Sequence, residues 1–225
     1  MSRRVPRTDL TATSYAILGL LAIRPWSTYE LAQQMERTLN NWWPRARSKL
    51  YEEPKKLAAH GLARTSKEPV GQRPRTMYAI TPAGRRALRQ WLSDPGRGPV
   101  LESEQLTKLF FADHGTTRDA RSQIDAAREW AATEIVGFAD AARPYLTARG
   151  PFPQRVATNM IVGRFMIDFY TLVYRWAQWA EAVVDGWPDD PRQATPDWGV
   201  MEDIVEAGGD VLRAESLRSR RKRSS

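Results

Sequence analysis

Basic side chains gather in two stretches near the start of the chain, and their types and spacing suit contact with a polyanion. The first stretch, residues 44–60, carries Arg45, Arg47, Ser48, Lys49, Tyr51, Lys55 and Lys56. The second is a turn-rich segment whose tip holds Arg73 and Arg75 on either side of a proline. Lys and Arg bind phosphate oxygens, and donors on a helix that fits the major groove read base edges. The chemistry these residues suit is binding to duplex DNA.

The elements that must position these cations can be predicted from caps and apolar spacing. Ser27 and Glu30 form a capping-box pattern just after Pro25, and Gly61 stands where a left-handed helix end belongs. Thr81 and Pro82 match a helix N-cap followed by an N1 proline. The expected order is a helix over 10–23, a helix from Ser27, a helix over 44–60, strands over 62–67 and 76–80, and a helix from Thr81 to Leu92.

This order predicts a winged helix, in which the third helix enters the major groove and the hairpin reaches the flanking backbone. Arg47, Lys49 and Tyr51 lie near the start of that helix, the part that normally meets base edges. Pro54 should bend or split the helix because it removes a backbone hydrogen bond to the carbonyl of Leu50.

The charge is distributed unevenly along the chain. Residues 1–94 have a net charge of +10, residues 95–212 of −7 and residues 213–225 of +5. A basic head on an acidic body is typical of a DNA-binding domain joined to an assembly domain. Chance asymmetry in an arginine-rich protein remains the plainer alternative.

A break at residues 93–99, with two Pro and two Gly, divides the chain. We expect a winged-helix DNA-binding domain over residues 1–94 and a helical dimerisation domain over residues 100–215. The basic tail 216–225 is expected to be disordered. The fold class is mainly α with a small β-hairpin wing, joined to an all-α, coiled-coil-like domain.

Four segments in order resemble the PadR-like regulators, a family named for a phenolic-acid-responsive repressor. They are residues 10–21 (LTATSYAILGLL), 27–31 (STYEL), 50–62 (LYEEPKKLAAHGL) and 73–84 (RPRTMYAITPAG). The resemblance covers roughly residues 10–92. It implies a winged helix with a helical dimerisation domain, places Tyr51 on the recognition helix and Arg73 and Arg75 on the wing, and makes repression the usual mode. In that family a proline commonly follows the tyrosine directly, whereas here Glu52 does.

Long apolar helices in the second half predict a dimer. Apolar residues recur every seven positions over 117–143, and the helix over 155–185 is apolar on nearly every side. One chain of this size cannot easily bury so many large side chains, so a second subunit is expected to cover them. The residues assigned to dimerisation are Ile124, Ala131, Ile135, Phe138, Phe165, Phe169, Leu172 and Trp176.

Three tryptophans offer a candidate effector pocket. Trp130, Trp176 and Trp179 could line a site for a flat aromatic compound, which the family resemblance encourages. Core or interface packing is the other explanation, and it is the more common role for such residues.

Several classes are disfavoured by composition. There is no Cys, and the two histidines, His60 and His114, lack a nucleophile or carboxylate at useful spacing, so we expect no enzyme, no cofactor and no metal site. Charges in the most apolar helix argue against a membrane span. The sequence thus predicts a cytoplasmic homodimer that binds a palindromic operator in double-stranded DNA, represses transcription and is released by a small effector. The alternative is a winged-helix adaptor that binds protein.

Overall fold

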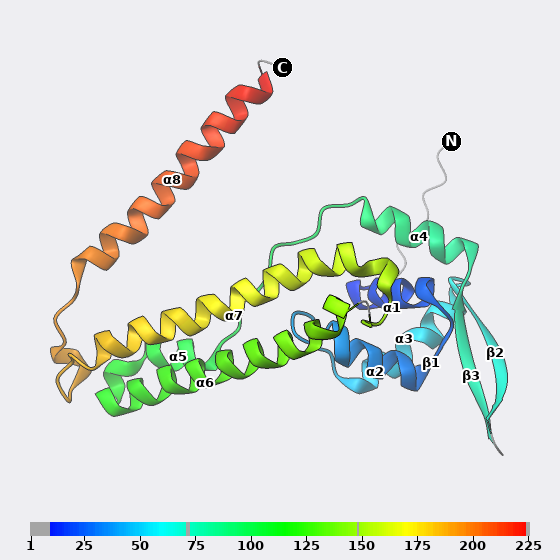
Figure 1. Ribbon diagram of the computed structural model, residues 1–225, viewed down its shortest axis with the longest axis horizontal. Helices are drawn as coiled ribbons and strands as arrows, with labels where there is room; N and C mark the ends of the chain where they lie inside the picture. The colour runs from blue at the N-terminus through cyan, green and yellow to red at the C-terminus, as the bar shows by residue number, and fades with distance from the viewer. Residues whose placement is uncertain (1–9, 71–72, 148, 224–225) are drawn as a thin grey trace. The chain divides into compact units, whose positions relative to one another are not determined.

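The computed structural model describes residues 10–70, 73–147 and 149–223, and Figure 1 traces its helices and strands. The chain divides into two compact units, Met1–Val100 and Leu101–Ser225.

The first unit is a three-helix bundle with a small antiparallel sheet and a fourth helix. Its elements are α1 (Ala12–Ile23), β1 (Trp26–Ser27), α2 (Thr28–Thr38), α3 (Arg47–Ala59), β2 (Ala63–Val70), β3 (Arg73–Ile80) and α4 (Pro82–Leu92). The core is formed by Ile17, Leu18 and Leu21 of α1, Leu31 and Met35 of α2, and Leu50 and Leu57 of α3. The winged-helix prediction is confirmed by this order.

Capping boxes close the N-terminal ends of α1 and α2 in this unit. Ser27 accepts a hydrogen bond from the Glu30 amide, and the Glu30 carboxylate accepts one from the Ser27 amide at 2.8 Å. A second capping box at Thr11 and Ser14 begins α1. The Ser14 hydroxyl also donates to Glu53 of α3 at 2.6 Å, so one serine both begins α1 and ties it to α3.

The sheet has the strand order β1-β3-β2, with both pairs antiparallel. Strands β2 and β3 form the wing, in register from Ala63 opposite Ile80 to Val70 opposite Arg73. The two-residue strand β1 pairs Trp26 with Tyr78 and was not predicted, because two residues carry no periodic signal. Through it the sheet joins the start of α2.

The second unit is built on two long helices that pack side by side (Figure 1). Its α-helices are α5 (Glu104–Phe110), α6 (Thr117–Ala142), α7 (Val156–Val184) and α8 (Trp198–Arg223). Short 3₁₀ turns lie at Ala112–His114, Arg143–Thr147, Pro153–Arg155 and Pro191–Gln193. Ala120 and Ile124 of α6 meet Ala177, Ala180 and Val184 of α7 in its core.

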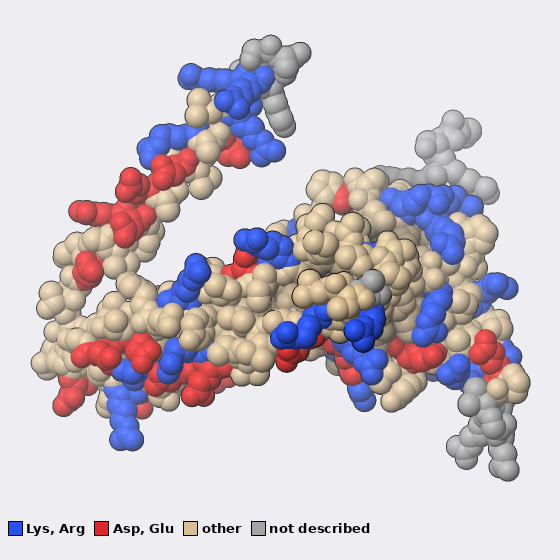
Figure 2. Space-filling view, in the orientation of Figure 1, with Lys and Arg blue, Asp and Glu red and all other residues tan. Residues whose placement is uncertain are grey.

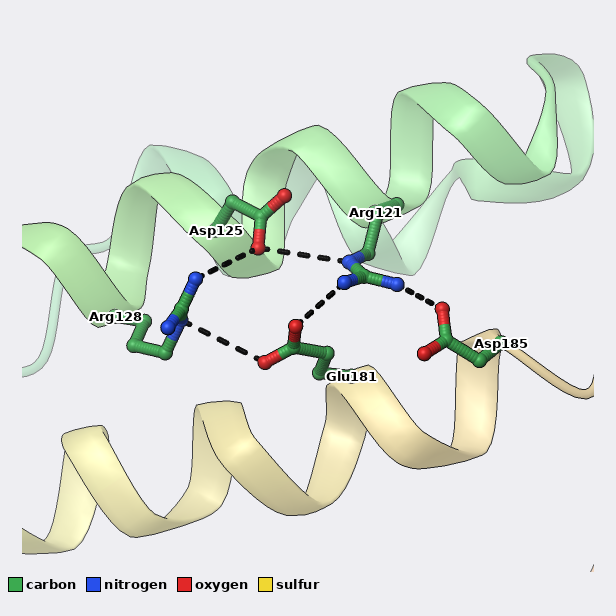
Figure 3. A network of polar contacts seen from close by, with 5 residues as sticks. All are labelled: Arg121, Asp125, Arg128, Glu181 and Asp185. Atoms are coloured by element: carbon green, nitrogen blue, oxygen red, sulfur yellow. Dashed lines mark hydrogen bonds and ion pairs between the residues drawn. The ribbon is translucent and has the colours of Figure 1, made fainter.

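A polar network joins α6 to α7 at the edge of that core (Figure 3). Arg121 of α6 binds Glu181 at 2.5 Å and also pairs with Asp185, both near the end of α7. Asp125 lies between Arg121 and Arg128, and Arg128 reaches the second oxygen of Glu181 at 3.6 Å. These pairs fix the register of the two helices at this end.

Two expectations for the second unit differ from the structure. The seven-residue stripe of α6 packs on α7 of the same chain, so Ile124 and Ala131 lie in the chain's own core. Residues 216–223, expected to be disordered, continue α8, since no Gly or Pro after position 209 interrupts it.

Helix α7 is long and apolar enough to cross a membrane by length and composition alone. The core helix of a soluble protein passes the same test. Here α7 packs along α6 and carries Arg164, Asp168, Arg175 and Glu181 spaced along its length. Such regular charges suit an interface between protein and water better than a lipid interior.

Candidate nucleic-acid interface

Helix α3 is held by its inner face and leaves its N-terminal turn in solvent. Leu50, Pro54 and Leu57 are buried, whereas Ser48 and Lys49 are exposed and Tyr51 is half-buried. The N-cap is Ala46, and in the described chain no side chain caps this end. The first amides of α3 are therefore open to an anion beside the exposed cations.

Pro54 does not split the helix, which is one element from Arg47 to Ala59. Its ring is fully buried, so packing offsets the backbone hydrogen bond that proline cannot donate. Lys55, next to it, is exposed, and Lys56 is half-buried. The two lysines thus lie one on the outer surface and one at its edge.

Arg45 lies outside α3, because the helix begins three residues later than predicted. Its guanidinium stacks over the ring of Trp43, 4.1 Å from the centroid. The Trp43 indole in turn donates to Thr13 of α1 at 3.2 Å. Arg45 therefore sits in a segment pinned to α1 and is not part of the helix surface that faces a groove.

Arg47 is tied to a carboxylate. Its Nε and Nη2 both donate to Glu36 of α2, the second at 2.7 Å, in a fork that bridges α2 and α3. The hydrogen bonds from Arg47 lower the pKa of Glu36, and the same contact raises the pKa of Arg47. Both side chains stay exposed, at 62% and 36%, so an outside anion has access to them. No pattern in the sequence predicts this pair, since the two residues are eleven positions apart and on different helices.

The wing presents its cations in two ways. Arg75 lies 3.7 Å from Glu30 and 3.6 Å from Glu68, and its Nε is buried without a hydrogen-bond partner among the described residues. Burial raises the pKa of Glu30, but hydrogen bonds from Ser27 and the charges of Arg75 and Arg24 outweigh it and lower that pKa overall. Arg75 therefore braces the wing against α2.

Two other cations of the wing, Arg64 and Lys67, are better exposed than Arg75. Arg73 is the first residue of β3, and the tip beside it, residues 71–72, lies outside the described chain. Arg64 and Lys67 of β2 are exposed and were missed, because single cations on a strand look like an ordinary solvated surface. They extend the basic character of the wing beyond its tip.

The predicted effector tryptophans do not gather in one site. Trp176 and Trp179 line an open groove along α7 together with Arg164, Asp168, Leu172 and Arg175. Trp130 of α6 lies instead edge-on to Tyr170, with ring centroids 5.6 Å apart, and to Phe169. Trp130 thus belongs to an aromatic cluster between α6 and α7, and the groove is left with two tryptophans.

The residues assigned to dimerisation separate into two groups. Phe165 and Leu172 are 58% and 64% exposed on α7, seven residues apart and so on one face, which Trp179 continues. Ile135, Phe138, Phe169 and Trp176 are partly buried within the unit. Ile124 and Ala131, being fully buried, are not available to a partner. The described residues hold no cluster of three or more His, Asp or Glu placed to bind a metal.

Comparison with known proteins agrees with this geometry. The sequence model described as "Transcriptional regulator PadR-like family" matches residues 17–90, and "Virulence activator alpha C-term" matches residues 102–185. The probable transcriptional regulator Rv1176c of Mycobacterium tuberculosis is 27% identical over 128 residues, 52% of this chain and 68% of that protein. The negative transcriptional regulator PadR of Bacillus subtilis is 33% identical over 99 residues, 43% of this chain and 54% of that protein.

Solved structures share the fold. Bacillus subtilis PadR in complex with operator DNA matches with a TM-score of 0.69 and 20% identity, covering 78% of this chain and all of that one. The same protein with p-coumaric acid matches with a TM-score of 0.63 and 22% identity, covering 78% and 99%.

The first unit, with an exposed recognition helix beside a wing, makes this chain a winged-helix DNA-binding protein, and its second unit is a helical domain of the kind that accompanies it. Its residues 17–90 match the PadR-like family of transcriptional regulators, and the chain shares the fold of PadR structures. That is a family of regulators and not of enzymes.

Proposed function

We propose that this protein is a cytoplasmic homodimeric repressor that binds a palindromic operator and is released by a small aromatic effector. The observation that carries the proposal is the exposed N-terminal turn of α3, where open amides, Ser48, Lys49 and the exposed, Glu36-bound guanidinium of Arg47 lie together. In helix-turn-helix proteins this part of the recognition helix meets base edges.

The roles of the cations follow from their surroundings. Arg47, Lys49 and Tyr51 are proposed to read bases, with Ser48, Lys55 and Lys56 at the backbone. Arg73 is proposed to contact phosphate or the minor groove, with Arg75 holding the wing in place. Arg45 is proposed to add charge near α1. The exposure of Arg64 and Lys67 supports adding both to the phosphate contacts.

A dimer suits the exposed apolar face of α7. Phe165, Leu172 and Trp179 lie on one side of this helix, and water does not favour such a face unless it is covered. Two copies related by a two-fold axis would present two recognition helices to half-sites one turn of DNA apart. The operator is accordingly proposed to be palindromic.

The effector is proposed to bind along α7, in a groove that shares Leu172 and Trp179 with the proposed dimer face. The groove there has an open volume of about 590 Å³ and is lined by Trp176 and Trp179 with two arginines nearby. A flat aromatic compound suits two tryptophans. The structure of PadR with p-coumaric acid supports the chemical class by relationship, since that compound is aromatic. No observation favours the adaptor alternative.

The test is fluorescence anisotropy with a labelled duplex from upstream of the protein's own gene and a scrambled duplex, across a salt series. Arg47→Ala and Tyr51→Ala should reduce the affinity ratio between the two duplexes. Arg73→Ala should weaken binding to both and lower the salt slope by roughly one unit. The matched control is Arg89→Ala on α4, which removes the same charge from an exposed helix outside the interface.

The expected gap between upstream and scrambled duplex is at least about a thousandfold. Equal losses on both duplexes for every α3 variant would contradict the division of roles between helix and wing. No binding to either duplex at low salt would overturn DNA binding itself and leave the adaptor.

A further inference from the structure

Two regions of the chain match known families, residues 17–90 and residues 102–185. Helix α8 is the largest described element outside them. It is strongly amphipathic over its first two thirds. Val200, Ile204, Val211 and their neighbours Met201, Val205 and Leu212 fall on one broad arc at 3.6 residues per turn, and the acidic residues fall opposite. Met201, Ile204, Val205, Val211 and Leu212 are between 53% and 74% exposed.

The intrinsic helix propensity of α8 is low in its middle. Gly208 and Gly209 stand in its middle, and glycine is the least favourable residue in a helix interior after proline. A Cβ at Gly208 would meet nothing within 4 Å, so nothing described in the chain requires a glycine there. Most helical stability in proteins comes from packing an apolar face, which points to an occupant outside the chain.

The charges of α8 are separated by halves. Residues 198–210 carry four carboxylates and no base, whereas residues 211–223 carry six bases and one carboxylate. Figure 2 shows acidic side chains over the first half of the helix and basic ones toward its end. Two such helices attract each other only when they run in opposite directions, because parallel copies place like charges together.

We propose that α8 pairs antiparallel with α8 of a second copy of this chain. The apolar seam is self-complementary about Val211. Val200, Ile204, Ala207, Val211 and Ala214 are spaced four, three, four and three residues apart, as in a coiled coil. Turning the helix end over end about Val211 sets Ile204 against the partner's Arg218 and brings Ala207 within one residue of the level of the partner's Ala214.

The two-fold arrangement also accounts for the basic end. Beyond Ala214 the seam is continued by Arg218 and Arg221, whose long aliphatic stems can cover the partner's Ile204 and Val200 while their charges meet the acidic half. Small residues at the next layer, Ala207 and Ala214, let the two backbones approach closely. The same helix therefore supplies both halves of its own binding surface.

This pairing rests on the proposed dimer and would add a second contact between the subunits to the α7 contact, since linked contacts raise effective concentration. It does not depend on DNA binding. The dimer through α7 and the α8 pairing can fail separately, because sedimentation of the unaltered chain measures the oligomeric state and the α8 variants test the pairing.

The chain has no cysteine, so introduced thiols give a direct test. Val211→Cys should form a disulfide with its own copy, because position 211 lies at the two-fold axis. Ile204→Cys and Arg218→Cys copies, co-expressed with tags of different size, should cross-link to each other under mild oxidation. Either variant alone should not cross-link. In the antiparallel pair, position 204 of one copy lies level with position 218 of the other, so each introduced thiol is about 21 Å along the helix axis from the same position in the partner.

The matched control is Glu202→Cys co-expressed with Arg220→Cys, which lie at the same level on the polar side and should not cross-link. Cross-linking of Ile204→Cys alone would mean parallel pairing and overturn the proposal. A wild-type dimer with no cross-link in the Ile204 and Arg218 mixture would overturn it while leaving the α7 dimer standing. Protection of the Val211→Cys thiol only by duplex DNA or by phosphatidylserine vesicles would assign α8 to an anionic partner instead.

Discussion

At the scale of single residues, carboxylates pair with two of the cations in the proposed DNA interface. Arg47 donates two hydrogen bonds to Glu36, and Arg75 lies between Glu30 and Glu68. An arginine that binds in a DNA groove must first break its ion pair with the carboxylate. Because this ion pair is broken on every DNA sequence, only a bidentate acceptor such as guanine offsets the lost interaction fully. Glu36 should therefore favour specific over nonspecific binding.

Replacing Glu36 by glutamine tests this competition. Glu36→Gln should raise affinity for a scrambled duplex by about two- to fivefold, the range of an exposed ion pair, and raise operator affinity less. Anisotropy on both duplexes measures the ratio. Glu52→Gln removes an equal charge from an exposed site on α3 and serves as the control. If the two variants behave alike, only net charge matters and the Glu36 contact has no part in discrimination.

At the scale of elements, local chemistry made the fold predictable. Ser27 with Glu30, Gly61 and Thr81 with Pro82 mark their boundaries through their own side chains or backbone, and the structure places each at a helix end. The predicted start of α3 was too early because Pro44 resembles an N1 proline. The stripe of α6 has coiled-coil spacing whether its partner is α7 or a second chain, so periodicity alone could not choose between them.

The contact between α4 and the start of the wing depends on a missing side chain. A Cβ at Gly84 would lie 2.2 Å from the Leu62 carbonyl oxygen and 2.9 Å from Ile80 Cγ1. Gly84→Ala should destabilise the first unit by about 1–3 kcal/mol or more, because backbone atoms cannot move aside. Urea unfolding measures it. Gly19→Ala in α1, where a Cβ meets nothing within 4 Å, should instead stabilise by about 0.5–1 kcal/mol.

The cap of α6 makes an acid-sensitive contribution. Hydrogen bonds from the Thr116 hydroxyl and amide lower the pKa of Asp119 below its usual 3.8. A carboxylate with a lowered folded pKa stabilises the fold above its unfolded pKa, and this is lost as pH falls through the folded value. Asp119→Asn should therefore weaken the second unit at neutral pH and flatten its stability between pH 4 and 2, as followed by circular dichroism. Unchanged pH dependence would exclude the cap as the cause.

At the scale of the whole molecule, the distributions of charge and of exposed apolar side chains differ between the first and the second part of the chain. Residues 1–94 carry +10 and hold the recognition helix, whereas the acidic residues 95–212 carry the apolar faces. Acidic charge around an assembly surface keeps it from competing for DNA. Affinity should then come from two heads acting together, which makes it depend on the α7 face.

The double change Phe165→Asp with Leu172→Asp tests that dependence. Both side chains are exposed on one face of α7, so the fold of the single chain should survive while the α7 contact between the copies is lost, because a charge in an apolar interface is costly. Combined with Val211→Asp, which removes the α8 pairing as well, the change should give a monomer in sedimentation, and operator affinity should fall at least about a hundredfold, since linked heads gain that much from effective concentration. Leu146→Asp, an equally drastic change at an exposed site outside α7, should leave both unchanged. A variant that stays dimeric and keeps its operator affinity would place the subunit interface elsewhere.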